Sequence, residues 1–124
     1  MTDWTDQELD RIGAAEELEI TTRRGDGSLR AWVPIWSVRV GDGLYVRSYR
    51  GTEGAWYRHA ASHGTARVRA AGVERDVTVE PAGEDTPAID DAYRGKYARY
   101  AGSHLPPMLS DRAVATTARL RPHD

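Results

Sequence analysis

The sequence predicts a mainly β protein with flanking helices (α+β), built as a six-stranded β-barrel. Two observations carry this prediction. Residues 21–77 compress strand-like runs, a Gly-rich arginine loop and one short helix into fewer than sixty positions. Two Gly-Asp-Gly tripeptides, ending at Gly27 and Gly43, separate the early runs, and the Asp-Gly dipeptide favours tight turns between strands. We expect residues 1–124 to form a single domain, because this length supports one hydrophobic core but not two.

A helix is expected before the first strand. Thr5 followed by Glu8 forms a capping-box pattern, which predicts a helix over about residues 6–14. Leu9 and Ile12 fall on one face of this helix, and we expect that face to contact the barrel. The first strand begins at Leu18. The other expected strands cover residues 29–40, 44–48, 66–70, 73–80 and 116–120.

The expected strand at residues 29–40 is apolar on both faces, which suits a position between a core and an interface. Pro34 within it predicts a bulge or a sheet edge, since proline cannot donate a ladder hydrogen bond. Ala71-Gly72 joins the fourth and fifth strands tightly.

Two further helices are expected, at residues 55–63 and 88–100. In the second, Ile89, Tyr93, Tyr97 and Tyr100 recur at helical spacing, so this stripe is expected to pack against the barrel. A polar loop containing Pro81, Gly83 and Pro87 precedes that helix. After it, Pro106-Pro107 breaks the chain, and Ser110 is expected to cap a last helical turn.

Charge is unevenly distributed although the net charge is only -2. The first nineteen residues carry seven acids and one base, whereas residues 28–73 carry seven arginines and two acids. A positive region on a near-neutral protein can concentrate an anionic ligand, or the arginines can form a solvated outer face. The negative total charge, the single lysine and the lack of a binding motif argue against nucleic acid as a partner.

The chain has no long apolar run and no cysteine. We therefore expect no membrane span, no disulfide and no thiolate metal site, and a cytoplasmic location is the simplest expectation. His59 and His63 stand at i and i+4, the spacing of two metal ligands on one helix face, but no acidic third ligand accompanies them. No metal site is therefore predicted. Haem ligation by these histidines is a low-ranked alternative, and no nucleophile elbow indicates a hydrolase.

The segment from Arg47 to Gly54 runs directly into the helix expected at residues 55–63. The N-terminus of a helix presents unpaired N–H groups and partial positive charge, which attract phosphate. Gly51 and Gly54 allow close approach of the backbone, and nearby arginines supply charge-assisted hydrogen bonds. The alternative is that these glycines only make a tight connection.

The aromatic residues of this region are compatible with a ligand site and with a purely structural role. Trp36 and Trp56 are candidates for the wall of a pocket on which a planar ring stacks, and the alternative is packing in the core or a dimer interface.

Several segments together resemble a known group of proteins. WTDQELDRI near the N-terminus, the central GAWYRHA, and AYRGKYARY followed by TARLRP resemble an uncharacterised bacterial family. That family is allied to the deazaflavin-dependent nitroreductase and FMN-binding split-barrel superfamily. The resemblance covers nearly the whole chain and implies a split β-barrel, FMN-binding-like, that assembles as a homodimer.

The resemblance also implies a cofactor, FMN or deazaflavin (factor 420), whose phosphate and ring are held by two segments. The first is the strand-turn-strand from Arg24 through Pro34, and the second is the strand, loop and helix from Arg47 through Arg58. No catalytic residue is assigned. The implied cofactor-binding residues are Arg24, Arg30, Arg47, Ser48, Arg50, Gly51, Trp56, Tyr57 and Arg58.

Two departures from the family pattern keep a second function open. Asp26 places a negative charge in the first turn, and His59-Ala60 replaces the usual Asn-Leu after the Trp-Tyr pair. The leading hypothesis is a flavin- or deazaflavin-binding oxidoreductase that acts on a small organic substrate. The alternative is a cofactor-free split-barrel protein that binds another small anionic ligand, or a structural module.

Overall fold

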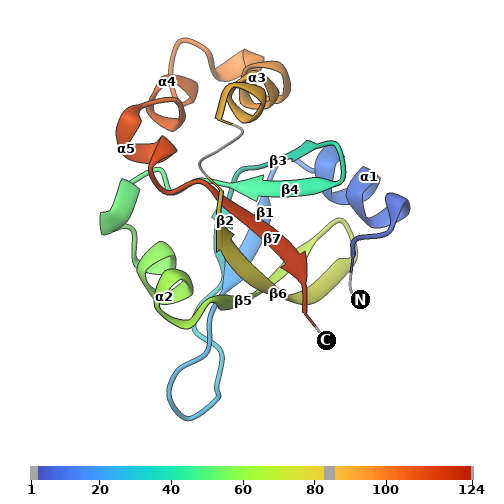
Figure 1. Ribbon diagram of the computed structural model, residues 1–124, viewed down its shortest axis with the longest axis vertical. Helices are drawn as coiled ribbons and strands as arrows, with labels where there is room; N and C mark the ends of the chain where they lie inside the picture. Colours follow the sequence, from blue (N-terminus) through green and yellow to red (C-terminus); the bar gives the residue numbers. More distant parts are fainter. Residues whose placement is uncertain (1–2, 83–85, 124) are drawn as a thin grey trace.

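The computed structural model describes residues 3–82 and 86–123, and these residues contain seven strands in one antiparallel sheet. The order across the sheet is β2-β1-β5-β6-β7-β4-β3. The two edge strands, β2 and β3, are neighbours in the sequence, so the sheet curves round into a nearly closed barrel (Figure 1). The strands are β1 (Leu18–Thr21), β2 (Val33–Ile35), β3 (Ser37–Val40), β4 (Gly43–Val46), β5 (Thr65–Ala70), β6 (Val73–Pro81) and β7 (Ala118–Pro122).

The barrel of the described residues has seven strands rather than the expected six, because the strand expected at residues 29–40 is divided at Trp36. Before that residue, β2 pairs with β1 through Leu18 and Ile35. After it, β3 pairs with β4 through Ser37 and Val46. Trp36 lies between the two strands and stacks on Tyr97 instead. The edge predicted from Pro34 is confirmed, since β2 is the outermost strand on its side.

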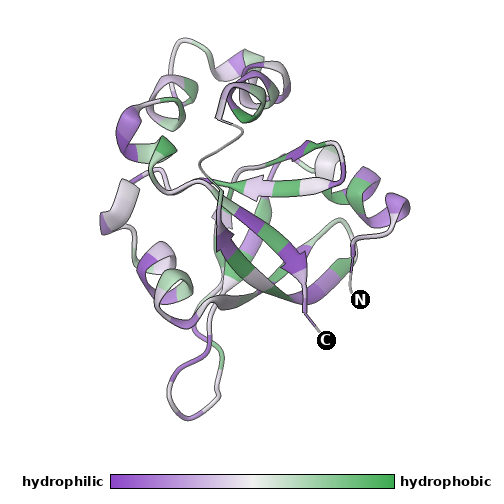
Figure 2. Ribbon diagram, in the orientation of Figure 1, coloured by the Kyte–Doolittle hydropathy of each residue, from purple (hydrophilic) through white to green (hydrophobic). Residues whose placement is uncertain are grey.

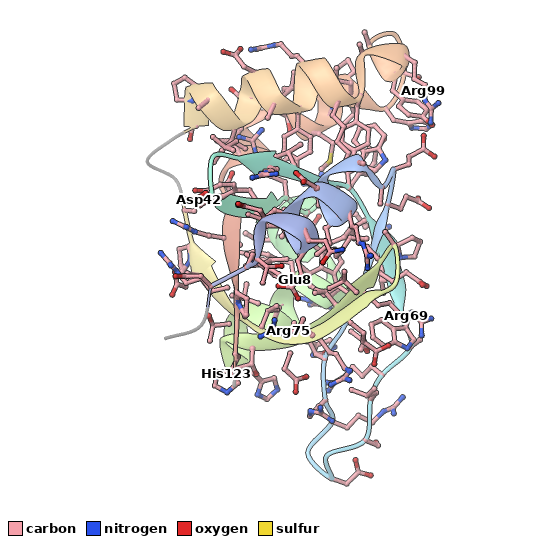
Figure 3. The ribbon with its side chains drawn as sticks, turned by 90° about the vertical axis from the view of Figure 1, so that its right-hand side faces the viewer. Glu8, Asp42, Arg69, Arg75, Arg99 and His123 are labelled. Atoms are coloured by element: carbon pink, nitrogen blue, oxygen red, sulfur yellow. The ribbon has the colours of Figure 1, made fainter. Side chains whose placement is uncertain are left out.

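The helix α1 (Asp6–Ala14) begins where the capping box predicts. Thr5 N donates to Glu8 Oε1 at 3.0 Å, and Glu8 N donates to Thr5 Oγ1 at 3.1 Å. Leu9 and Ile12 are buried against the barrel, as expected. Glu8 also lies beside Arg75 of β6 (Figure 3), with an ion-pair distance of 3.1 Å.

The barrel interior holds the larger core. Apolar and polar residues alternate along most of the strands (Figure 2), as period-two patterning requires. The buried core residues are Trp4, Leu9, Ile12, Leu18, Ile20, Leu44, Val46, Ala66, Val68, Val73, Val77, Ala118 and Leu120.

A second core lies outside the barrel, beneath a helical cap. The cap consists of α3 (Thr86–Lys96), η2 (Ala98–Tyr100), α4 (Leu105–Met108) and α5 (Asp111–Val114), and it gathers on one side of the barrel (Figure 1). Ile89, Tyr93 and Tyr97 are fully buried there, which confirms the expected packing of the tyrosine stripe.

Some boundaries in the cap differ from the expectation. The helix expected to reach residue 100 ends as α3 at Lys96 and resumes as the short η2. Ser110 caps α5 as predicted, since its hydroxyl accepts from Ala113 N at 3.3 Å. Gly83, from the expected polar loop, lies outside the described residues.

The remaining helix, α2 (Ala55–His63), has the predicted bounds. It lies against the barrel below α5 in Figure 1, and its C-cap is Gly64, which adopts a left-handed φ of 71°. No helix in the described ranges has the length and apolar character needed to cross a membrane.

Candidate functional site

A cavity of about 680 Å³ opens between the barrel, the start of α2 and the helical cap. This size is in the range of small-molecule and cofactor sites. Its walls come from β2, the end of β4, the loop that leads into α2, and the η2–α4 region. The lining residues are Glu16, Glu17, Val33, Pro34, Ile35, Trp36, Arg47, Ser48, Tyr49, Arg50, Gly54, Ala55, Trp56, Tyr100, His104 and Met108.

Aromatic side chains form part of this wall. Trp36 is held by stacking on Tyr97, with ring centroids 3.9 Å apart and planes within 5°. Tyr97 is fixed in turn, because its hydroxyl donates to Glu16 O at 2.7 Å and accepts from Ser37 N at 3.1 Å. Burial raises the pKa of the Tyr97 phenol well above its ordinary value, so this anchor stays protonated. The wall therefore presents a preorganised planar surface.

One end of the cavity is the N-terminus of α2. The N-cap is Gly54, which offers no side chain to cap the first turn. Arg50 is exposed next to this terminus, and Ala55 and Trp56 of the first turn line the cavity. Free N–H groups and an arginine together make this end suitable for an anion.

Ser48 lies directly beneath that helix terminus. A Cβ added at Gly54 would lie 2.4 Å from Ser48 Oγ, so only glycine leaves room for the hydroxyl. Ser48 is buried, and its Oγ has no hydrogen-bond partner among the described residues. Its backbone N donates to Thr116 Oγ1 at 2.8 Å, which fixes the residue. A buried hydroxyl without a partner at a ligand-sized cavity is a candidate hydrogen-bonding group for a ligand.

Arg47 also lines the cavity, but its guanidinium points into the protein. Nη1 lies 2.6 Å from Asp90 Oδ1 of α3, and Nε donates to Thr117 Oγ1 at 2.9 Å. Nη1 also donates to Met108 O at 3.0 Å. Sequence reasoning placed Arg47 near the anion, and it had no signal for these distant partners.

Gly51 has a structural role that involves a residue the sequence analysis did not single out. Its φ is +64°, and a Cβ there would lie 2.4 Å from Arg112 Cγ of α5. Arg112 donates to Arg50 O from Nε at 3.0 Å and from Nη2 at 2.7 Å, and it pairs with Glu53 at 2.6 Å. Arg112 therefore clamps the loop that leads to α2.

The remaining predicted residues do not line the cavity. Arg24 and Arg30 lie on the hairpin between β1 and β2, where Arg24 Nη1 donates to Leu29 O at 2.8 Å and Arg30 Nη1 donates to Arg23 O at 2.6 Å. Tyr57 and Arg58 lie on α2 and are not among the residues that line the cavity. The structure thus gathers Arg47, Ser48, Arg50 and Trp56 at the cavity, with Gly51 immediately beside them in the loop.

The histidine pair also lies away from the cavity. Desolvation and the charges of Arg30 and Arg58 lower the pKa of His59, so this imidazole is held neutral in a positive surrounding. No group of three or more potential metal ligands occurs within residues 3–82 and 86–123. His104, which sequence reasoning did not assign, is the histidine that lines the cavity.

The cavity lining also includes acidic residues. Glu16 Oε1 accepts from Tyr100 OH at 2.7 Å, and Glu16 pairs with Arg99 at the end of the cap (Figure 3). Glu17 lines the cavity as well. The lining therefore carries Arg50 beside the start of α2 and also the carboxylates of Glu16 and Glu17.

Comparison with solved structures identifies the fold. An F420-H2 dependent reductase is similar with a TM-score of 0.61 and 19% identity, over 86% of this chain and 93% of that one. The heme storage protein HutZ of Vibrio cholerae gives 0.64 and 11%, over 96% and 90%. A protein proposed to confer 5-nitroimidazole antibiotic resistance, from Bacteroides thetaiotaomicron, gives 0.64 and 17%, over 100% and 82%. The fold is the FMN-binding-like split barrel.

The sequence also places the chain in a protein family. Residues 8–120 match the model of a family described as "Uncharacterized protein conserved in bacteria (DUF2255)", and the chain belongs to that family. A search of curated proteins by sequence gives no match.

Proposed function

We propose that this protein binds FMN or a deazaflavin in the cavity and acts as an oxidoreductase on a small organic substrate. The observation that carries the proposal is the combination, in one cavity of about 680 Å³, of an aromatic wall and the N-terminus of a helix without a side-chain cap. A planar ring with a phosphate-bearing tail matches both features.

The residues present fit the phosphate of such a cofactor. The first turn of α2 and Arg50 supply donors and positive charge, and the partnerless hydroxyl of Ser48 lies beneath them. Gly54 leaves the space that a larger residue would fill. We assign phosphate binding to Ser48, Arg50 and the N–H groups at the start of α2.

The ring would lie along the aromatic wall. Trp36 is already held by Tyr97 and needs little further ordering to stack on a ligand. When bound, the cofactor supplies hydride chemistry, while the chain orients it and excludes water. This division explains why the cavity needs no nucleophile or metal for the proposed reaction.

The assembly that we propose is a homodimer. The cavity is bordered by the edge strand β2, and Pro34 on that edge is exposed. An unpaired edge beside an open ligand site is a natural place for a second copy to complete the wall. Light scattering coupled to size-exclusion chromatography tests this part: a monomer at micromolar concentration would remove it.

One observation favours a second candidate, a cofactor-free module that binds another small anion. Arg24 and Arg30 use hydrogen bonds within their own hairpin, and the exposed Asp26 carries a negative charge at its tip. The hydrogen bonds from Ser28 lower the pKa of the Asp26 carboxyl, so it stays ionised. The cationic groups left to a ligand are then those at α2, enough for one phosphate-sized anion.

A visible absorbance titration separates these candidates. Purified protein is titrated with FMN, with deazaflavin (factor 420) and with haem. The proposal predicts saturable binding with a shifted flavin or deazaflavin spectrum. Binding of haem alone would redirect attention to His104, and binding of none of the three would leave the cofactor-free module as the better account.

A further inference from the structure

Arg47 is the most deeply buried charged side chain near the cavity. Its exposed fraction is 1%, and its guanidinium contacts groups from three separate parts of the chain. Asp90 comes from α3, Met108 O from α4, and Thr117 from the segment just before β7. These contacts join the barrel to the helical cap at the point where β4 passes into the anion loop, residues 47–54.

A second contact reinforces this junction. Thr116, the neighbour of Thr117, accepts a hydrogen bond from Ser48 N at 2.8 Å. The first two residues of the anion loop, Arg47 and Ser48, are therefore held by two consecutive threonines. Both threonine hydroxyls are themselves oriented, since Thr116 donates to Ala113 O at 2.6 Å and Thr117 donates to Val114 O at 2.7 Å.

The charge of Arg47 is paired with Asp90, although Arg47 Nη2 has no hydrogen-bond partner among the described residues. Asp90 lies 2.6 Å from Nη1, and the Arg47 side chain has no exposed surface. In a buried pair the carboxylate neutralises the guanidinium at close range, so little net positive charge is left for a ligand. Arg50, by contrast, is exposed, and none of the ion pairs within the described residues involves it.

We infer that Arg47 is a positioning residue: its buried network with Asp90 and Thr117 holds Ser48 and the anion loop in place without contacting the anion. The inference rests on the proposed function for the identity of the anion, but the network acts on the loop whether or not a cofactor is bound. Arg47 thus determines the geometry of the site, whereas the charge of Arg50 and the N-terminus of α2 attract the anion.

The sign of the effect of Asp90→Asn tests this inference. If Arg47 were a direct ligand, removing the Asp90 charge would free the guanidinium and tighten FMN binding. If Arg47 positions the loop, the same change loosens the network, and the dissociation constant for FMN rises about tenfold or more. Asp91→Asn on the same helix is the matched control, because Asp91 is exposed and pairs only with Arg94 in the described structure.

Amide hydrogen exchange of the protein without ligand gives the second readout. Asp90→Asn is expected to speed exchange at residues 48–54, and Asp91→Asn is expected to leave it unchanged. If wild-type protein binds neither FMN nor deazaflavin, the proposed function fails, while exchange still tests the positioning role. Thr117→Val serves if Asp90→Asn does not fold, since it removes the hydrogen bonds of the Thr117 hydroxyl to Arg47 Nε and Val114 O but keeps the ion pair between Arg47 and Asp90. Unchanged exchange, or tighter FMN binding, overturns the inference.

Discussion

Replacing Gly51 with alanine tests how the anion loop is held against the cap. Gly51 has a φ of +64°, and its Cα faces the side chain of Arg112, whose Cγ would lie 2.4 Å from an added Cβ. The substitution therefore imposes two separate costs. The backbone is strained, and the side chain of Arg112 must move away from Arg50 O.

The magnitude follows from these two parts. A left-handed conformation costs a non-glycine residue about 1–2 kcal/mol. Displacing Arg112 weakens two hydrogen bonds, and since that side chain is more than half exposed, solvent replaces part of them, leaving about 1 kcal/mol. The total is about 2–3 kcal/mol. For a domain of this size that corresponds to a fall in Tm of roughly 8–12 °C.

Thermal unfolding followed by circular dichroism measures this change. Gly41→Ala is the matched control, because Gly41 has a φ of +59° but nothing within 4 Å of an added Cβ. It should cost only the backbone strain, about 1–2 kcal/mol. In an Arg112→Ala background the two glycine substitutions should become equally costly. Equal losses already in the wild-type background would refute the clamp.

Three further predictions follow from the cavity and its surroundings. Arg50→Ala should weaken FMN binding by about tenfold or more in fluorescence titration, because a hydrogen bond to a charged group contributes roughly 1.5–3 kcal/mol. Arg58→Ala, outside the cavity, should change FMN binding little. A larger loss of binding in Arg58→Ala than in Arg50→Ala would contradict the proposed site. Burial lowers the pKa of Lys96 from 10.5 to about 8. Between pH 8 and pH 10.5 the unfolded chain therefore binds more protons than the folded chain, so the free energy of unfolding rises with pH. Urea titrations at several pH values should show this rise, and Lys96→Met should flatten it. Tyr97→Phe should cost about 1–3 kcal/mol by leaving buried Ser37 N without its partner, and an unchanged Tm would exclude this anchor for Trp36.

Much of the fold could be predicted because its determinants are local. The capping box at Thr5 set the start of α1, and the bounds of α2 matched the expectation at both ends. The division of the second strand could not be predicted in the same way. Trp36 leaves the ladder to stack on Tyr97, a residue sixty-one positions away, and no local pattern encodes that contact.

In the candidate site, too, the residues set by local sequence could be predicted, and the contacts between distant residues could not. The sequence placed Ser48, Arg50 and Trp56 near a helix terminus because the loop and helix are contiguous. It had no means of separating Arg50 from Arg47, since the difference lies in Asp90 and Thr117, which only the folded chain brings to one of them. Composition gives each arginine the same charge, and burial decides which charge a ligand meets.

The start of α2, with Ser48 and Arg50, is the proposed binding site for the phosphate of a flavin-type cofactor. Isothermal titration calorimetry with FMN and with riboflavin, which lacks the phosphate, isolates that contribution. The account predicts that wild-type protein binds FMN at least tenfold more tightly than riboflavin, and that a Ser48→Ala/Arg50→Ala variant loses most of this difference while remaining folded. Equal affinity for the two ligands in the wild-type protein, or an unchanged preference in the variant, would contradict the account.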